Sequence, residues 1–311
     1  MKYILLIMIS FSISIILRYL IAVLAIAFYT LIERKLLGYI QLRKGPNKII
    51  LAGIPQPIAD AIKLFFKEQS YPTISNYMLF TVAPIIRLIL ALLLWAIYPH
   101  SNSSLYLTFG ILYFLCVSSI NVYATFLSGW CSNSKYSLLG ALRGVAQTIS
   151  YEVSISLILI SMLFLHKKID ISLITTNIIT WPIILIPIIF FLWFVTNLAE
   201  TNRAPFDFAE GESELVSGFN TEYSGGLFAL IFIAEYASIL IIRVLTMVFF
   251  SGSLIIFPRT ELILKSLIIA AIFIWVRASF PRIRYDNLIN LTWKRFLPIR
   301  LSIIILLIII I

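Results

Sequence analysis

Eight long apolar stretches dominate the sequence, and polar residues gather between them. The stretches cover, to within a few residues, 9–31, 76–98, 105–127, 140–164, 173–198, 225–250, 262–280 and 290–310. An α-helix needs roughly 20 apolar residues to cross a bilayer, and each stretch is about that long. The stretches are continuously apolar, whereas barrel strands alternate apolar and polar residues. The pattern therefore predicts an all-α polytopic membrane protein with about eight transmembrane helices.

Composition supports this fold class. Of the 311 residues, 61% are hydrophobic and 12% are charged, whereas about 25% of a soluble protein is charged. A water-facing surface cannot be built over most of such a chain, which excludes a soluble enzyme and a disordered protein. We expect a single membrane domain over residues 1–311. Two cysteines and two histidines are too few for haem or iron–sulfur ligation, so we expect no metal in this chain.

Charge predicts how the helices are oriented. Thirteen lysines and arginines lie in the loops that follow odd-numbered spans or at the adjoining start of the last span, and four lie on the other side. The positive-inside rule then places the odd loops on the cytoplasmic or matrix side and both termini on the opposite side. The net charge of +10 would indicate nucleic-acid binding in a soluble protein. Anchoring in the membrane explains it here, so we expect no nucleic-acid partner.

The first odd loop, residues 32–75, contains an amphipathic segment at 55–67. One helical face of this segment is apolar and holds Ile58, Ile62, Phe65 and Phe66. Another face is charged and holds Asp60, Lys63 and Lys67. The segment is too short and too charged to span the membrane. We interpret it as an interfacial helix with its apolar face in lipid. The alternative is an ordinary loop helix packed on the protein.

Half of the fourteen acidic residues lie between positions 200 and 235, mostly in an acidic loop at 199–224. They are Glu200, Asp207, Glu210, Glu212, Glu214, Glu222 and Glu235. If residues 207–214 are helical, one face of the helix holds Asp207, Glu210 and Glu214. Mutual repulsion then raises some of their pKa values. Such a cluster can store and pass protons near neutral pH. The alternative is a solvated loop whose acids neutralise arginines.

Two glutamates lie inside predicted spans. Glu152 and Glu235 are each about ten to twelve residues from the odd-loop end, which is near the middle of the bilayer. A carboxylate there normally faces the protein interior and is neutral or partnered. Tyr151 and Gln147 are close to Glu152 in sequence and are candidates for a hydrogen-bonded proton path. We predict a polar path from the acidic loop into the membrane; the alternative is a buried structural pair.

Basic residues border the same side of the membrane, at Arg34 and Arg43 after the first span and in a basic loop at 281–289. Glu200 and Arg203 have the i,i+3 spacing of a helical ion pair. The sequence contains no nucleophile–base set, phosphate-binding loop or metal-ligand spacing. We therefore assign no catalytic residue to this chain and expect any redox chemistry to take place on another chain.

Five segments carry a family resemblance: Glu33–Asn47, Gln56–Phe65, Ala146–Val153, Glu200–Asn220 and Pro281–Asp286. They resemble subunit 1 of NADH:ubiquinone oxidoreductase, respiratory complex I, from about residue 31 to 300. The isoleucine-rich spans look like a mitochondrially encoded copy. The resemblance implies a subunit of the mitochondrial inner membrane with eight helices, matrix-facing odd loops and termini toward the intermembrane space.

The resemblance also implies roles and partners. The family forms the chamber that admits ubiquinone, the substrate, at the junction with the peripheral arm. NADH, FMN and iron–sulfur clusters are bound by partner subunits, and this chain binds no cofactor. The expected partners are the peripheral-arm subunits at the quinone site, neighbouring membrane-arm subunits and lipids. The chamber or its gate would be bordered by Glu33, Arg34, Arg43, Asp60, Arg203, Asp207, Glu210, Glu212 and Arg282. The proton or charge link would include Glu152, Glu200, Glu214, Glu222, Glu235 and Tyr151.

Two positions depart from the family's pattern. Arg87 and Arg243 lie within predicted spans where the family usually has uncharged residues. A lone charge there is costly, so we expect each to meet an acid or another specific partner. Three other functions remain open: an ion-coupled transporter, which would show two related halves, the membrane anchor of a quinone-independent hydrogenase, and a purely structural anchor.

Overall fold

The computed structural model describes residues 2–48, 52–99, 107–176, 181–252 and 258–310, leaving aside the side chains of 2–11, 172, 175, 176, 212, 213, 258, 259 and 310. The described residues form helices and no strand, which confirms the all-α prediction. Six of the described helices are long and apolar enough to cross a membrane. They correspond to the first four, the sixth and the seventh predicted spans.

Helices follow one another along the described parts of the chain. In order, they are α1 (Lys2–Ile40), α2 (Gln56–Phe66), α3 (Tyr77–Leu94), η1 (Trp95–Ile97), α4 (Gly110–Cys131), α5 (Lys135–His166), α6 (Ile171–Thr176), α7 (Pro182–Leu185), α8 (Pro187–Glu200), α9 (Glu212–Leu215), η3 (Gly218–Asn220), α10 (Gly225–Phe250), α11 (Pro258–Ser279), α12 (Tyr285–Asn290), the π-helical η4 (Leu291–Phe296) and α13 (Leu297–Ile310).

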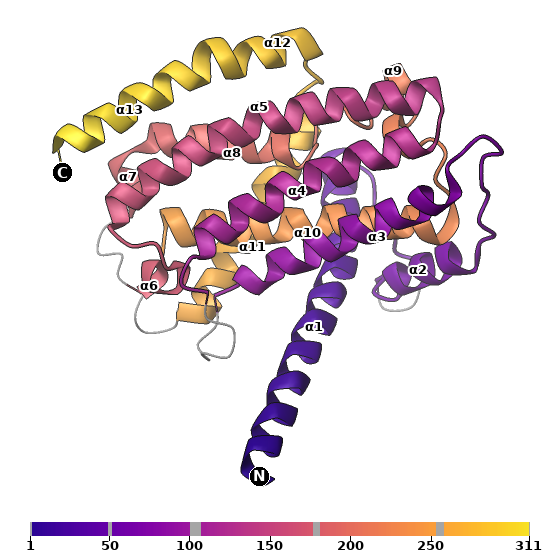
Figure 1. Cartoon of the computed structure of the whole chain (residues 1–311), viewed down its shortest axis with the longest axis horizontal. Helices are drawn as coiled ribbons and strands as arrows, with labels where there is room; N and C mark the ends of the chain where they lie inside the picture. Colours follow the sequence, from indigo (N-terminus) through magenta and orange to yellow (C-terminus); the bar gives the residue numbers. More distant parts are fainter. Residues whose placement is uncertain (1, 49–51, 100–106, 177–180, 253–257, 311) are drawn as a thin grey trace.

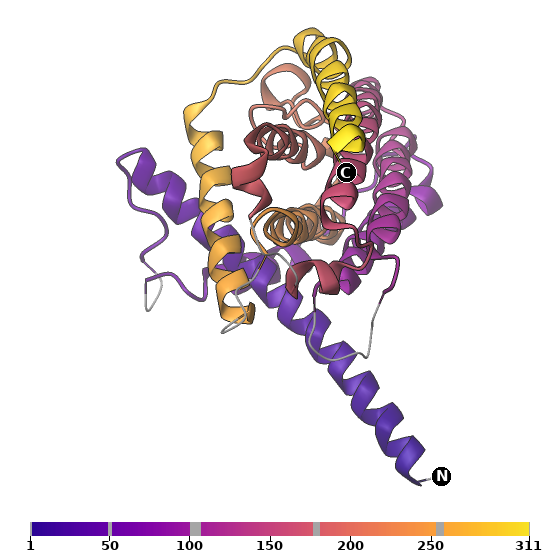
Figure 2. The same ribbon diagram turned by 90° about the vertical axis from the view of Figure 1, so that its left-hand side faces the viewer.

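The long helices α3, α4, α5, α8 and α10 run side by side as a bundle, and α13 lies along its outside (Figure 1). Seen from the end of the bundle, α11 flanks α10, and α1 crosses beneath them (Figure 2). The N-terminal half of α1 projects away from the other helices (Figure 2). Its described apolar side chains Ile13, Ile16, Leu17 and Leu20 are exposed. The main core lies between α4, α5, α8 and α10, where Trp193 packs edge-on against Phe249.

The fifth predicted span is not one continuous helix. The segment expected at 173–198 is divided into α6, α7 and α8, with Pro182 and Pro187 at the first positions of the last two. Proline lacks the N–H of the helical ladder, so it is tolerated at a helix start and ends the helix before it. With 14 residues, α8 is only about 21 Å long, which is shorter than a bilayer core.

The ends of other spans also differ from the prediction. The first helix continues to Ile40, so the first loop starts near residue 41 and Glu33 is helical. The last helix already begins at Tyr285, inside the predicted basic loop 281–289, and runs through η4 into α13. Apolar content locates the membrane core, but polar helical turns continue beyond it, so hydropathy underestimates helix length.

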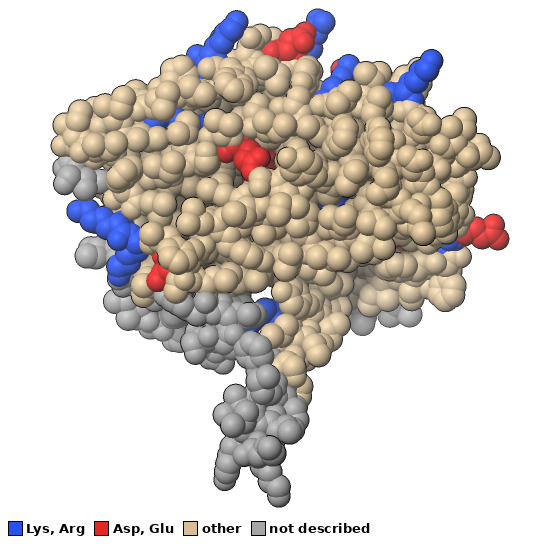
Figure 3. Space-filling model, viewed as in Figure 1, with Lys and Arg blue, Asp and Glu red and all other residues tan. Residues whose placement is uncertain are grey.

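The predicted amphipathic helix is present as α2, and its four apolar residues are exposed. Contact with lipid remains a prediction. Over the whole molecule, most of the visible surface carries no charged side chain, and the most prominent charges project from its edges (Figure 3). A broad uncharged surface is what a protein embedded in a bilayer requires.

The acidic loop is held against the bundle by aromatic anchors. Phe206 and Phe208 are buried in a cluster with Tyr151 and Phe273. Close backbone packing adds a second attachment, because a Cβ on Gly140 of α5 would lie 2.8 Å from the Cα of Gly218. The loop is therefore a fixed part of the fold, and its charged residues have defined positions.

Candidate functional site

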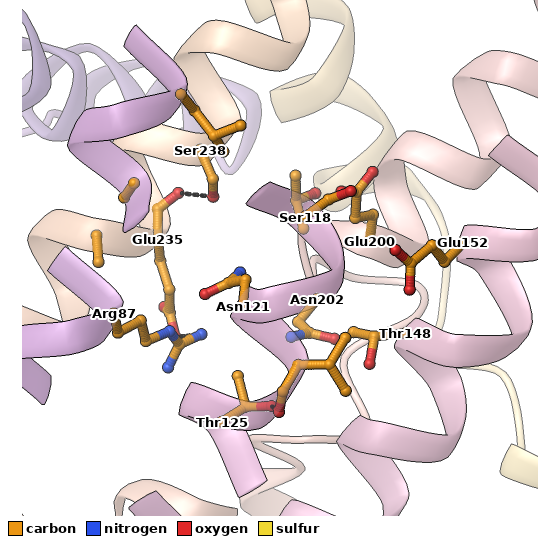
Figure 4. A pocket seen from close by; sticks show the side chains of 15 residues that line it. Arg87, Ser118, Asn121, Thr125, Thr148, Glu152, Glu200, Asn202, Glu235 and Ser238 are labelled. Atoms are coloured by element: carbon orange, nitrogen blue, oxygen red, sulfur yellow. Dashed lines mark hydrogen bonds and ion pairs between the residues drawn. The ribbon is translucent and has the colours of Figure 1, made fainter. Parts of the chain in front are cut away.

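A polar cavity of about 40 Å³ lies inside the bundle between α3, α4, α5, α8 and α10. Glu152, Glu200 and Glu235 line it, together with Arg87 (Figure 4). The three glutamates come from positions 152 to 235 of the chain and line the same cavity. The polar path predicted from the sequence needs such an arrangement. A cavity of this volume has room for about three water molecules. The other polar residues that line it are Ser118, Asn121, Thr125, Thr148, Thr201, Asn202 and Ser238.

One end of the cavity holds an ion pair between α3 and α10. Arg87 Nη2 lies 3.0 Å from Glu235 Oε1, and the two side chains are only 5% and 10% exposed. The expectation that Arg87 meets an acid is confirmed. Arg243 meets an aromatic partner instead: it donates a hydrogen bond to the Tyr29 hydroxyl and lies over the Tyr29 ring. Both buried arginines are therefore partnered, as their cost in the membrane demands.

The other end of the cavity holds Glu152 and Glu200, which approach each other from α5 and α8 (Figure 4). Asn121 and Asn202 lie between the two ends. Among the described residues, Glu200 Oε2, Asn202 Oδ1 and Arg87 Nη1 are buried without a hydrogen-bond partner. Buried polar groups are normally satisfied by protein or by water. The space and these open donors and acceptors together fit a small chain of ordered water.

A second cluster lies at the odd-loop end of the bundle, around Glu33 of α1. This carboxylate is 5% exposed and accepts hydrogen bonds from Arg203, at 3.2 Å, and from Arg277. The Arg203 guanidinium lies 4.5 Å from the centre of the Tyr236 ring. Burial lowers the pKa of Arg203, but the charge of Glu33, the interactions with Tyr236 and the charge of Glu235 together outweigh burial, so the pKa is raised. Arg203 therefore pairs with Glu33, and the expected i,i+3 pair with Glu200 is wrong.

Asp207 and Glu210 continue this cluster into the acidic loop. Asp207 Oδ2 accepts a hydrogen bond from Arg282 at 3.0 Å, and Glu210 Oε1 accepts one from Asn220 at 3.0 Å. Burial raises the pKa of both carboxyls, and for Glu210 the charges of Glu235 and Asp207 raise it further. The prediction of raised pKa values in this loop is thus confirmed for these two acids, with burial as the larger cause.

Residues 207–214 do not form one helix, so the condition for a shared acidic face is not met. Residues 208–210 form a turn, and α9 begins only at Glu212, after Gly211. The anchoring of Phe208 in the core sets the backbone path here, which overrides helical periodicity. Glu214 consequently leaves the acid cluster and pairs with Arg143 at the surface, 2.6 Å apart. The side chain of Glu212 lies outside the described residues.

Several predicted site residues lie elsewhere. Arg34 pairs with Asp60 at 2.5 Å and so links α1 to α2 at the surface. Arg43 is exposed, and Glu222 is half-buried at the end of the acidic loop. Tyr151 is fully buried beside Phe206, outside the cavity. Neighbouring residues on a helix point about 100° apart, so Tyr151 cannot share the direction of Glu152.

Gln147, which was expected on a proton path, has another role, and two residues of the clusters were not predicted. Gln147 Nε2 donates 2.8 Å hydrogen bonds to the carbonyls of Ala199 and Phe206, so it fixes the start of the acidic loop and does not line the cavity. Asn121 and Tyr236 were not singled out, although polar side chains inside apolar spans are the signal that identifies them.

The fold and the two clusters define a polytopic membrane protein with a polar cavity in its interior and a charged cluster at one end. Comparison with known proteins places it within that class. The family model described as NADH dehydrogenase matches residues 13–308. The chain therefore belongs to the NADH dehydrogenase family of membrane subunits.

Curated relatives agree with this assignment. The chain is 51% identical over 291 residues to NADH-ubiquinone oxidoreductase chain 1 of Zaedyus pichiy, covering 90% of both proteins. It is 52% identical over 278 residues to chain 1 of Aedes aegypti, covering 89% of this chain and 88% of the relative. Chain 1 of Lampetra fluviatilis is 50% identical over 289 residues, covering 91% and 90%. The family resemblance of the sequence is confirmed, and the chain is a membrane subunit of this oxidoreductase.

Proposed function

We propose that this chain forms the membrane part of the ubiquinone chamber in a proton-pumping NADH:ubiquinone oxidoreductase. In this proposal, it transmits the effect of quinone reduction to the pumping arm through buried glutamates. It carries no redox centre itself, and NADH, FMN and the iron–sulfur clusters belong to partner subunits. The observation that carries the proposal is the meeting of Glu152, Glu200 and Glu235 in one polar cavity beside the charged junction at Glu33.

The proposed chamber lies at the odd-loop end of the bundle. A charged wall leads from α1 to the loop before α12. It consists of two ion pairs, Arg203 with Glu33 and Arg282 with Asp207. The exposed apolar face of α2 provides a rim on which an isoprenoid tail enters from lipid. Arg34 and Asp60 hold α2 against α1 at that rim. The quinone headgroup is reduced beyond this wall, by residues of a peripheral-arm partner.

The proposed coupling is electrostatic. Quinone reduction takes up protons at the chamber and thereby changes the charge of Asp207 and Glu210, whose partly buried carboxyls interact electrostatically. Buried charges interact strongly because the protein interior screens them weakly. The change is felt at Glu235, which is an electrostatic neighbour of Glu210, and then at Glu200 and Glu152 across the cavity. Water in the cavity carries the protons.

The location follows from the same proposal. The complex lies in the mitochondrial inner membrane, with the odd loops and α2 facing the matrix and both termini toward the intermembrane space. The first loop and the acidic loop meet at this end, since Ser70 of the first loop hydrogen-bonds Ser224 at the end of the acidic loop. Partner subunits of the peripheral arm dock on this end, and other membrane-arm subunits and lipids cover the uncharged sides.

The assembly is tested first on native gels of solubilised membranes. We expect the chain to co-migrate with a very large band that oxidises NADH, and a quinone-site inhibitor to block its quinone reductase activity but not electron transfer to a water-soluble acceptor. Migration as a small, inactive species from intact membranes would contradict the proposal. So would a band that oxidises hydrogen in place of NADH.

The coupling is tested with Glu152→Gln in the assembled complex. We expect quinone reduction to persist while the number of protons pumped per electron falls, because the variant cannot hold a mobile proton in the cavity. Glu261→Gln, at the opposite end of the bundle and paired with Lys265, is the matched control and keeps normal pumping. Full coupling in Glu152→Gln would show that the cavity is not part of the link.

A further inference from the structure

Arg87 contacts two parts of the molecule that the proposed coupling must connect. Its guanidinium pairs with Glu235 in the cavity, and its guanidinium carbon also lies 4.9 Å from the centre of the Phe219 ring. Phe219 belongs to η3 in the acidic loop. The side chain of Arg87 is 5% exposed, so it is held between the cavity and the loop with little contact with water.

A hydrogen bond connects η3 to Glu210, in an earlier turn of the acidic loop. Asn220, the residue after Phe219, donates a 3.0 Å hydrogen bond to Glu210 Oε1. Two residues of the cavity act electrostatically on Glu210. The charge of Glu235 disfavours an ionised Glu210, whereas the charge of Arg87 favours it. The other charged groups acting on Glu210 are Asp207 and Arg203. Arg87 is therefore a cation that the loop acid and the cavity acid share.

Arg87 is the one cation among the described residues that line the cavity. Its Nη2 faces Glu235, whereas its buried Nη1 has no hydrogen-bond partner among the described residues. A guanidinium has five N–H donors in a fixed planar arrangement, so one group can serve two acceptors. The unused donor lets Arg87 strengthen or weaken its pairing with Glu235 without leaving its place.

We propose that Arg87 is a positioning residue that connects Glu210 of the acidic loop to Glu235 of the cavity, and so converts a charge change at the loop into proton uptake in the membrane. This rests on the proposed coupling function. When Glu210 is protonated, Arg87 pairs fully with an ionised Glu235. When Glu210 gives its proton to the chamber, its new charge competes for Arg87. Glu235 then takes up a proton that Glu200 or Glu152 supplies through the cavity water.

Every proton in this step has a source and a destination. One proton leaves Glu210 toward the chamber, where quinone reduction consumes it, and one proton moves from the far end of the cavity to Glu235. Asn121 and Asn202 lie along that route between the two ends (Figure 4). No electron is transferred on this chain, and Arg87 keeps its charge throughout.

The test compares four variants in the assembled complex in liposomes: Arg87→Gln, Arg87→Lys, Glu235→Gln and the double variant Arg87→Gln/Glu235→Gln. Protons pumped per electron and the NADH:quinone rate are measured together. We expect Arg87→Gln to lower the pumping ratio severalfold while quinone reduction continues, and Arg87→Lys to restore most of the ratio because it keeps the cation. Arg284→Gln, an exposed arginine paired with Asp286, is the matched control and leaves the ratio unchanged.

The double variant isolates the connection. It removes both charges together, so it leaves no lone charge in the cavity and assembles even where Arg87→Gln does not. If Arg87 acts through Glu235, the double variant has the same pumping ratio as Glu235→Gln. A further loss in the double variant, or a normal ratio in Arg87→Gln, overturns the proposal.

An infrared measurement gives an independent readout. In Arg87→Gln, we expect Glu235 to be protonated and to show the carbonyl stretch of a carboxylic acid. This band should disappear when Glu235→Gln is added. If Arg87→Gln shows no such band, the assignment is wrong. The outcome is distinguishable from failure of the coupling function itself. If Glu152→Gln pumps normally, the whole link is wrong, whereas if Glu152→Gln is uncoupled and Arg87→Gln is not, only the role of Arg87 is wrong.

Discussion

Arg203 of the acidic loop donates a hydrogen bond to Glu33 of α1, although the two residues are 170 positions apart. The pair joins the first helix to the loop after α8, and Arg277 of α11 completes it on the other side of the carboxylate. Three separate parts of the chain thus depend on one buried carboxylate. The junction that we assign to the quinone chamber is at the same time a structural joint.

Removing the arginine of this joint should destabilise the protein. Arg203→Gln leaves Glu33, which is 5% exposed, with Arg277 as its remaining described charge partner. Breaking a buried ion pair by removing one partner costs roughly 3–5 kcal/mol. We expect the assembled complex to dissociate on native gels at a clearly lower temperature. Arg277→Gln should have a smaller effect because Arg277 is more exposed, and an equal effect from Arg284→Gln at the surface would contradict this explanation.

The acidic loop should make stability depend on pH. Burial raises the folded-state pKa of Glu210 above its ordinary value of 4.5. A raised carboxyl pKa means that the folded protein binds the proton more tightly than the unfolded chain does. The stabilising contribution of Glu210 is therefore complete below about pH 4.5 and is lost as the pH rises toward the raised pKa.

The corresponding measurement is the melting temperature of the complex as a function of pH, in wild type and in Glu210→Gln. Above pH 4.5, we expect the melting temperature of the variant to fall less steeply with pH than that of wild type, because an amide does not ionise. Glu214→Gln, which removes an acid from the exposed surface of the same loop, is the control and should keep the wild-type slope. Identical slopes in wild type and Glu210→Gln would show that the carboxyl is not the source.

The sequence predicted the helices better than the site because the two depend on different information. Hydropathy located the spans, since burial in lipid acts on each segment separately. It missed the break before α8 because averaging over a window hides Pro182 and Pro187 inside an apolar run. Glu152 and Glu235 were recognised because a single carboxylate in a span is conspicuous. The cavity itself depends on which faces of α4 and α5 meet, and that is decided by packing of distant segments.

Ion-pair partners show the same limit. Spacing along a helix suggested Glu200 as the partner of Arg203, but the chain turns after Glu200 and brings Arg203 to Glu33. The presence of Arg87 in a span implied an acidic partner, and Glu235 fulfils that role. Sequence alone could not say which of the acids it is, because helices α3 and α10 are separated by more than a hundred residues.

Gln147 should be needed to hold the start of the acidic loop. Its Nε2 donates to the carbonyls of Ala199 and Phe206, and the side chain is fully buried. Gln147→Leu keeps the approximate volume but removes one hydrogen bond from each carbonyl, which then keeps its backbone donor, Asn202 N–H or Phe208 N–H at 3.2 Å. The expected cost is about 0.5–1.5 kcal/mol for each hydrogen bond lost. We expect a lower melting temperature and faster proteolysis within residues 201–224. Ser154→Ala, which removes a buried hydroxyl that donates to the Tyr151 carbonyl of the same helix and lies outside the cavity lining, should change little.

The close approach of α5 to the acidic loop gives the last prediction. A Cβ on Gly140 would lie 2.8 Å from the Cα of Gly218 and from the backbone nitrogen of Phe219. These are backbone atoms that cannot move aside as a flexible side chain would. Gly140→Ala should therefore push η3 away from α5, although alanine is the better helix former by about 1 kcal/mol in an open helix.

Because η3 carries Phe219, which lies against Arg87, the displacement should also reach the cavity. We expect Gly140→Ala to lower both the stability of the complex and the number of protons pumped per electron. Gly144→Ala is the matched control: it lies one turn further along the same face of α5, and its added Cβ meets the Cβ of Ala209 at 3.1 Å, a milder contact. If both substitutions stabilise the helix and leave pumping intact, the backbone contact at Gly140 does not position the loop.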